Sequence, residues 1–295
     1  MKKLHRLVLA MTLLASSTFS ISLFDLVKTG TPEQVKEALS DIPANKWPKD
    51  SLGNTLLMLA VASDNAEVVQ VLIDKGVVVD EPDQRHSTAL MFAARHNTSP
   101  IIIAKLVKAR ADVNATDKND RTALGTAAEF NAKPMIVAEL VKSGADVNAV
   151  NEFGSSVLEL SAYSNNRSIV ASLIKVGANV NARDENGETA LTQAVDNNNL
   201  SIVSELIKAG VNVNATTTYG RTALMAAVKN KTHPEIIDEL IKAGANVNAI
   251  DTEMGRSALI YAAQYFTTPE VKPIVIAEHI DVGAKTIPLL IRAGA

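Results

Sequence analysis

The residues that most often carry catalysis or bind metals are few in this sequence, and they are scattered. None of the 295 residues is cysteine, which excludes disulfides, thiolate zinc sites, iron–sulfur clusters and cysteine nucleophiles. Beyond residue 20 the histidines are His86, His96, His233 and His279, and no two are spaced i, i+4. Nucleophile elbows, phosphate-binding glycine loops and dinucleotide fingerprints are also absent. We therefore expect no catalytic residue, no metal and no cofactor.

Carboxylates are abundant, but their positions favour structural roles. One group falls at turns, where an aspartate side chain accepts hydrogen bonds from nearby backbone N–H groups: Asp83, Asp117, Asp184 and Asp251. A second group falls on the polar faces of predicted helices: Glu139, Glu205 and Glu239. No spacing indicates a catalytic pair. A hydrolase that uses scattered carboxylates with His86 and His96 remains a distant alternative.

The elements that would position these residues repeat along the chain. One phrase begins at a threonine or serine and recurs at intervals of 33 to 35 residues: Thr55, Thr88, Thr122, Ser156, Thr189, Thr222 and Ser257. A second phrase, Gly-Ala/Val-Asp/Asn-Val-Asn-Ala, keeps its own register and begins at Gly144, Gly177, Gly210 and Gly244. Two phrases that stay in phase over more than 200 residues indicate a repeat array.

Each period predicts two helices and a loop. Residues 122–130 form a short helix with a face of small residues, and residues 134–142 form a second helix with a larger apolar face. Proline recurs at the start of the second helix, where its missing N–H costs nothing. Glycine closes most second helices, but Arg110 replaces it once and predicts a strained helix end. The Val-Asn-Ala segment and a turn such as 184–187 predict an extended hairpin-like loop.

These motifs resemble those of the ankyrin repeat. The matching phrases are Thr-Ala-Leu-x-x-Ala-Ala, Leu-Ile-Lys-Ala-Gly-Ala and Asp/Asn-Val-Asn-Ala. The resemblance implies an all-α solenoid over 21–295: a degenerate cap at 22–50, about seven repeats starting near 51, 84, 118, 152, 185, 218 and 252, and an insertion at about 271–285. The usual Thr-Pro-Leu-His phrase is altered, which predicts loss of the histidine relay. The histidine positions hold Met58, Met91, Gly125, Glu159, Thr192, Met225 and Ile260.

The first 20 residues have a different character. Lys2, Lys3 and Arg6 precede an apolar run at 7–15 and then small residues, which is the order of a secretory signal peptide. The run is about half the length that a bilayer span needs. We expect cleavage near residue 20 and export to a periplasm or the extracellular space, from a bacterium by preference. A short membrane-associated or core helix is the alternative.

The resemblance implies a non-catalytic protein that binds another protein on the concave side of the stack. We expect a monomer with no nucleic-acid partner, because the formal charge is only −3, and no membrane span after cleavage. Repeat phase gathers aromatic and basic residues on the hairpin tips and helix ends. The predicted partner-binding residues are Phe130, Phe153, Tyr163, Tyr219, Arg121, Arg221, Lys229 and Tyr265. Two alternatives stay open: the rings pack against the next hairpin, or the protein regulates, inhibits or protects an exported enzyme.

Overall fold

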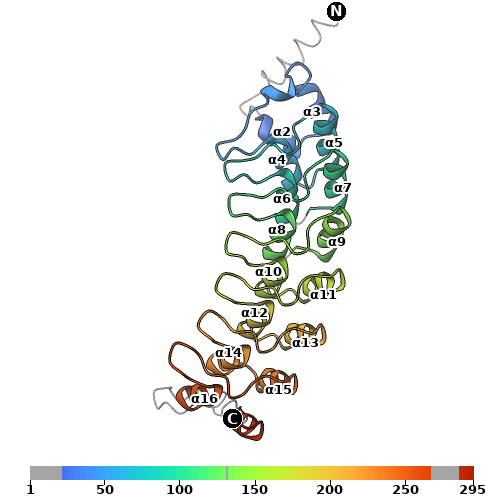
Figure 1. Cartoon of the computed structure of the whole chain (residues 1–295). Coiled ribbons are helices and arrows are strands. Elements are labelled where there is room, and N and C mark those ends of the chain that lie inside the picture. Colours follow the sequence, from blue (N-terminus) through green and yellow to red (C-terminus); the bar gives the residue numbers. More distant parts are fainter. Residues whose placement is uncertain (1–21, 97, 131, 267–285) are drawn as a thin grey trace, which may run out of the picture.

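Two parallel rows of helices and one row of loops make up the molecule (Figure 1). The computed structural model describes residues 22–96, 98–130, 132–266 and 286–295. The predicted signal peptide at 1–20 and insertion at 271–285 lie outside the described residues. Within them, regular structure is helical except for two isolated antiparallel bridges, Val150 with Ser156 and Thr216 with Thr222. The predicted helix pairs are therefore confirmed.

The inner row of helices lies next to the hairpins and the outer row lies behind it (Figure 1). The inner row consists of α2 (Leu23–Thr29), α4 (Leu56–Ala62), α6 (Ala89–Arg95), α8 (Ala123–Glu129), α10 (Val157–Tyr163), α12 (Ala190–Asp196), α14 (Ala223–Lys229) and α16 (Ala258–Phe266). The outer row consists of α3 (Pro32–Ala38), α5 (Ala66–Asp74), α7 (Pro100–Lys108), α9 (Pro134–Lys142), α11 (Arg167–Lys175), α13 (Leu200–Lys208) and α15 (Pro234–Lys242). A short 3₁₀ helix, η1 (Ala44–Lys46), lies in the loop after α3.

Inner helices begin at a capping side chain. The threonine or serine before each of α4, α6, α8, α10, α12 and α14 is the N-cap and accepts a hydrogen bond from the backbone N–H three residues later. Each of these helices packs against the inner helices before and after it. Small side chains permit that close approach: in α8 the whole stretch from Ala123 to Ala128 is buried. Leu124 and Leu191 are 0% and 1% exposed, so both are buried in the inner row.

Outer helices are amphipathic and bury one face against the inner row. In α9 that face is Ile136, Val137 and Leu140, and proline occupies the first turn of α3, α7, α9 and α15. The closing glycines have positive φ, for example 94° at Gly144. Arg110 has φ 68° at the equivalent position, so the strained helix end predicted there is confirmed.

Hydrogen bonds join each hairpin to the next one. The carbonyl at each tip accepts from the backbone N–H one repeat later, at N···O distances of 2.8 to 3.3 Å. The accepting residues are Leu52, Arg85, Asn119, Phe153, Asn186 and Tyr219. Deeper in the loops, Asn114, Asn148, Asn181 and Asn214 accept from the next repeat through Oδ1 at 2.7 to 2.8 Å. The loops thus form a continuous ladder, although they are too short to form named strands.

Both ends of the stack contain shortened or altered repeats. At the N-terminal end α2 packs on α4 and α3 packs on α5, and Val27 and Val35 are buried. At the C-terminal end residues 286–292 are helical, and Leu290 is buried. Asn248 donates to the Gly294 carbonyl at 2.9 Å, as Asn214 does to that of Gly244. Gly294 therefore occupies the place of a helix-closing glycine. Within the described ranges, none of the helices has the length and apolar character needed to cross a bilayer.

Candidate functional site

The hairpin tips and the C-terminal ends of the inner helices form one surface, which we call the hairpin face. Its large apolar side chains are exposed to solvent, with exposed fractions from 40% to 64%: Leu52, Phe130, Phe153, Tyr163, Tyr219 and Met254. The ladder bonds fix the backbone beneath several of them. Leu52, Phe153 and Tyr219 are themselves ladder acceptors. The surface therefore presents apolar groups from an ordered backbone.

Repeat phase predicted where the aromatic residues lie. Phe153 and Tyr219 are at hairpin tips, 58% and 54% exposed, and Tyr163 is the last residue of α10, 64% exposed. Phe130 is the C-cap of α8, and Tyr265 lies in the last turn of α16. Phe130, Phe153, Tyr163 and Tyr219 are thus 40% to 64% exposed. Such exposure does not fit the alternative in which these four rings pack as core against the next hairpin. Their role in binding stays a prediction.

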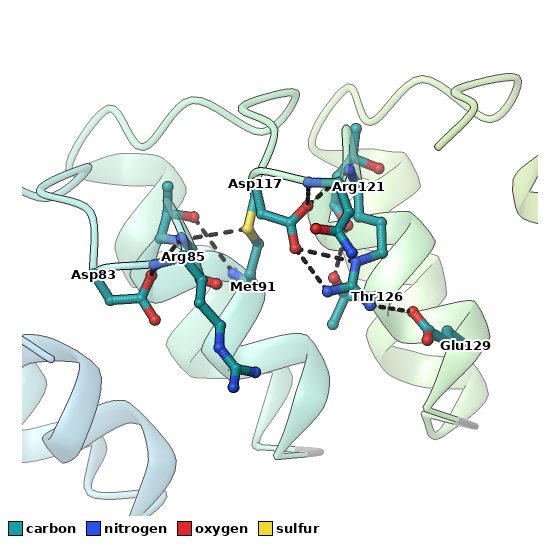
Figure 2. A network of polar contacts seen from close by, with 11 residues as sticks. Asp83, Arg85, Met91, Asp117, Arg121, Thr126 and Glu129 are labelled. Carbon is teal, nitrogen blue, oxygen red and sulfur yellow. Dashed lines mark hydrogen bonds and ion pairs between the residues drawn. The ribbon is translucent and has the colours of Figure 1, made fainter. Parts of the chain in front are cut away.

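Arg121 already has acidic partners within its own repeat. Its Nη2 and Nε donate to Asp117 Oδ2 at 2.9 and 3.1 Å, and its Nη1 donates to Glu129 Oε2 at 2.7 Å (Figure 2). Burial lowers the pKa of Arg121. The hydrogen bonds that Arg121 donates to Asp117 and Glu129, together with the charges of these two carboxylates, outweigh burial and raise the pKa. An acid on a partner would compete with both carboxylates, so the predicted contact with Arg121 is less favourable than its position alone indicates.

The other two predicted basic residues differ from each other. Arg221 forms an ion pair with Glu253 at 2.5 Å, and its guanidinium carbon lies 5.4 Å from the Tyr219 ring centroid. Lys229 ends α14, is half-buried and forms no ion pair within 4 Å among the described residues. The stacking of Arg221 on Tyr219 holds one aromatic tip in place. Partner contacts by both residues stay predictions.

Three carboxylates, Asp184, Glu188 and Asp196, lie near a buried fourth, Glu159, between α10 and α12, and sequence reasoning did not group them. Glu159 is 3% exposed. Burial raises its pKa to about 8, with a contribution from the charges of Asp184 and Glu188, while a hydrogen bond from Gln193 acts in the opposite direction. Asp196 is exposed at the end of α12, and desolvation together with the charge of Glu188 raises its pKa. Comparing equivalent positions across repeats would have revealed the group.

Residues with catalytic chemistry do not converge in the described part of the chain. No group of three or more histidine, aspartate or glutamate side chains there has the arrangement of a metal site. His86 occupies a turn with φ 62°, and His96 caps α6 with its ring 5.7 Å from that of Phe92. Burial and then the charge of Arg95 lower the pKa of His96. Nothing in this geometry pairs either histidine with a carboxylate.

A hollow lies at the loop after α3. Trp47, Pro48, Leu56 and Val77 form much of its lining. Glu81 also lines it, and its carboxylate is bound by Lys49. The lining is thus mixed in polarity, and its one acid pairs with a lysine.

Comparisons with known proteins agree with this geometry. The family profile described as "Ankyrin repeats (3 copies)" matches residues 23–117, 100–184, 158–251 and 191–286. Among solved structures, the ankyrin repeat domain of Bcl-3, described as a unique member of the IkappaB protein family, is similar with a TM-score of 0.64 and 28% identity. The match covers 71% of this chain and 94% of that one. A comparison with curated protein sequences found no match. The profile covers most of the described residues, and the chain belongs to the ankyrin-repeat family.

Proposed function

We propose that this protein is an exported, non-catalytic binding module that recognises another protein through the hairpin face. Ankyrin arrays generally mediate protein–protein interactions. The observation that carries the proposal is the set of exposed apolar side chains on the third, fourth and sixth repeats, Phe130, Phe153, Tyr163 and Tyr219. Tyrosine and tryptophan are enriched among interface hot spots. A row of such rings in water is the kind of surface that a partner buries.

The ladder makes this surface suitable for binding. Tyr219 and Phe153 extend from backbones that are hydrogen-bonded to the next repeat, and Tyr219 is further restrained by Arg221. Groups that are ordered before association lose less conformational entropy when a partner docks. Aromatic side chains also have few rotatable bonds. The rings therefore supply contact area at low entropic cost.

Export and the monomeric state belong to the same proposal. Residues 1–20 have the charge and hydropathy pattern of a secretory signal peptide, which favours a periplasmic or extracellular location and, in our interpretation, a bacterial origin. The absence of cysteine suits a compartment in which thiols would be oxidised. The small negative formal charge disfavours nucleic acid as the ligand.

Affinity capture from the native compartment, followed by mass spectrometry, tests the proposal. The wild-type protein should enrich a specific protein, and the Phe153→Ala/Tyr219→Ala variant should lose it. The matched control is Ile101→Ala on α7, which also removes an exposed apolar side chain, 61% exposed, but from the outer row. Equal capture by wild type and the aromatic variant would reject the hairpin face. Should the captured protein be an enzyme, the narrower function of inhibitor or protective partner follows.

A further inference from the structure

Repeats three and five contain the same three positions with different charges. In the third repeat these positions hold Asp117 in the hairpin turn, Arg121 before the N-cap of α8, and Glu129 at the end of α8. In the fifth repeat, 67 residues later, they hold Asp184, Glu188 and Asp196. We call the latter three residues the acidic trio. A glutamate thus stands where the third repeat has its arginine.

Backbone hydrogen bonds show that the two sites share one register. The Arg121 N–H donates to Asp117 Oδ1 at 3.0 Å, and the Glu188 N–H donates to Asp184 Oδ1 at 2.8 Å. Glu129 and Asp196 are each the last residue of a seven-residue inner helix. The positions are therefore equivalent in three dimensions as well as in sequence.

The third repeat shows how a guanidinium fits at these positions. The Arg121 side chain extends between the turn and the end of α8, with Asp117 on one side and Glu129 on the other (Figure 2). A planar guanidinium can satisfy two carboxylates at once because its N–H groups form a rigid fork. The fifth repeat keeps both outer carboxylates and lacks the cation.

The carboxylates of the fifth repeat form no close ion pair in the described residues. None of Glu159, Asp184, Glu188 and Asp196 forms an ion pair within 4 Å there. Asn230 donates to Asp196 Oδ1 at 2.7 Å, and Lys229 acts on Asp196 only through its charge. Arg183, next to the trio in sequence, donates instead to the Thr216 carbonyl.

A buried oxygen beside the trio is also unsatisfied. Glu159 is 97% buried, and its Oε2 has no hydrogen-bond partner among the described residues. Asp184 and Glu188 are the acids whose charges act on it, and Gln193 of α12 is its side-chain hydrogen-bond partner. A buried polar atom left unpaired costs free energy. A cation bound at the trio would reduce the repulsion among its three carboxylates.

We propose that the acidic trio binds an arginine side chain of the partner protein. This inference rests on the proposed function and names the chemistry that the partner must present. The guanidinium takes the place that Arg121 occupies in the third repeat, between Asp184 and Asp196. Tyr163 ends the inner helix one repeat before Asp196, and Asn197 donates to its carbonyl at 2.8 Å, so the two helix ends are neighbours. The exposed Tyr163 ring is available for cation–π attraction to the same arginine. The chain already uses this contact, since the Arg95 guanidinium carbon lies 4.6 Å from the Phe130 ring centroid.

Titration with a short peptide tests the inference without the partner. The probe is acetyl-Gly-Arg-Gly-amide, followed by the backbone amide shifts of the protein at low ionic strength. We expect saturable shifts at Glu188, Gln193 and Asp196, and at least tenfold weaker binding by the citrulline peptide, which keeps the shape but lacks the charge. Glu188→Gln/Asp196→Asn should lower the affinity for the arginine peptide at least tenfold. The control is Glu67→Gln, which changes an exposed acid on α5 and should leave that affinity unchanged. Equal binding of both peptides, or unchanged binding by the double variant, would overturn the inference.

A charge reversal provides a second test in which the protein becomes more stable. Glu188→Arg should rebuild the arrangement of the third repeat, with the new guanidinium held by Asp184 and Asp196. The variant should melt at a higher temperature than wild type and lose at least tenfold in affinity for the arginine peptide. A variant that is less stable and still binds the peptide would show that the two sites are not equivalent.

The two proposals can fail separately. If Phe153→Ala/Tyr219→Ala abolishes capture of the partner while Glu188→Gln/Asp196→Asn leaves capture unchanged, the proposed function stands and the arginine site is wrong. If neither variant affects capture, the hairpin face itself is wrong. Loss of capture with both variants supports both proposals.

Discussion

At the residue scale, the positions where the family usually has histidine carry five residue types, and three of these types bear a group that can accept a hydrogen bond: methionine, threonine and glutamate. Thr192 Oγ1 accepts from the N–H of its N-cap, Thr189, at 2.8 Å, and Met58 and Met91 accept through sulfur at 3.4 and 3.5 Å. These bonds stabilise helix starts within a repeat. Glu159 is the exception, because it brings an ionisable group into a buried position.

Glu159 makes stability depend on pH. Its pKa is about 8 in the folded protein and about 4.3 in an unfolded chain. Between those values the folded state binds one more proton than the unfolded state, so the free energy of unfolding falls as pH rises, by up to about 1.4 kcal/mol per pH unit. Glu159→Gln should remove this decline and be more stable than wild type at pH 8.5. Urea unfolding at pH 5, 7 and 8.5 measures it; parallel pH profiles for the two proteins would contradict the assignment.

At the scale of single elements, the sequence predicted most of the fold. The period, the helix pairs, the proline starts and the glycine ends were all readable, because each depends on local geometry that a residue type imposes. The hairpins are the partial exception: extended loops were expected, and only two isolated bridges form. The hairpin backbones are ordered by hydrogen bonds to the next repeat, which asparagine side chains and tip carbonyls accept. The sequence of a single repeat does not reveal bonds between repeats.

Candidate site residues were harder to predict for a related reason. Repeat phase located the exposed rings. It did not predict that Arg121 forms ion pairs with Asp117 and Glu129. It also did not predict that the buried Glu159 lies near Asp184, Glu188 and Asp196. Which charged side chains pair depends on which residues face each other in the folded stack. The same repeat position can hold a cation in one repeat, as at Arg121, and an acid in another, as at Glu188. Comparing equivalent positions between repeats is the way in which the sequence alone could have indicated the acidic group.

The closing residue of α7 offers a matched pair of variants. Arg110 adopts a left-handed conformation with φ 68°, whereas Gly144 does so at the end of α9, where an added Cβ would meet no other atom within 4 Å. Arg110→Gly should stabilise the protein by about 0.5–1 kcal/mol, because glycine adopts this conformation without strain. Gly144→Ala should destabilise it by about 1 kcal/mol. Chemical denaturation measures both, and shifts of the same sign would contradict this account.

Buried leucines of the inner row should carry much of the stacking energy. Leu124→Ala and Leu191→Ala each leave a cavity between repeats and should cost about 2–5 kcal/mol. Lys142→Ala, on the exposed side of α9, is the control and should change stability by no more than about 0.5 kcal/mol. Hydrogen exchange should show the loss of protection centred on the altered repeat and its neighbours. A loss below about 0.5 kcal/mol for either leucine would mean that the repeat phase is wrong.

At the scale of the whole molecule, the main helix contacts of the described repeats are within a repeat or with the next one, and the hairpin loops form one row along the stack (Figure 1). Such an architecture separates stability from recognition. Buried aliphatic and small side chains hold the stack together, and the tips are free to vary in charge and size. The same surface can therefore carry an internal arginine clamp in one repeat and an acidic trio in another.

Export is a property of the whole chain and can be tested directly. The mature protein should begin near residue 18 to 21 and should be found outside the cytoplasm of the organism that makes it, because the basic, apolar and small-residue segments of 1–20 follow the order of a cleaved signal. N-terminal sequencing of the purified native protein and cell fractionation measure this. An intact Met1 on a cytosolic protein would refute it.

The most direct measurement of the central claim is the affinity of Phe153→Ala/Tyr219→Ala for the captured partner, made together with its melting temperature. Both rings are more than half exposed, so their removal should leave the melting temperature nearly unchanged. We expect the same variant to lose about 2 kcal/mol or more of binding free energy, the usual threshold for a hot spot. An unfolded variant would show that the rings are core, and a folded variant that binds as tightly as wild type would contradict a docking site on the hairpin face.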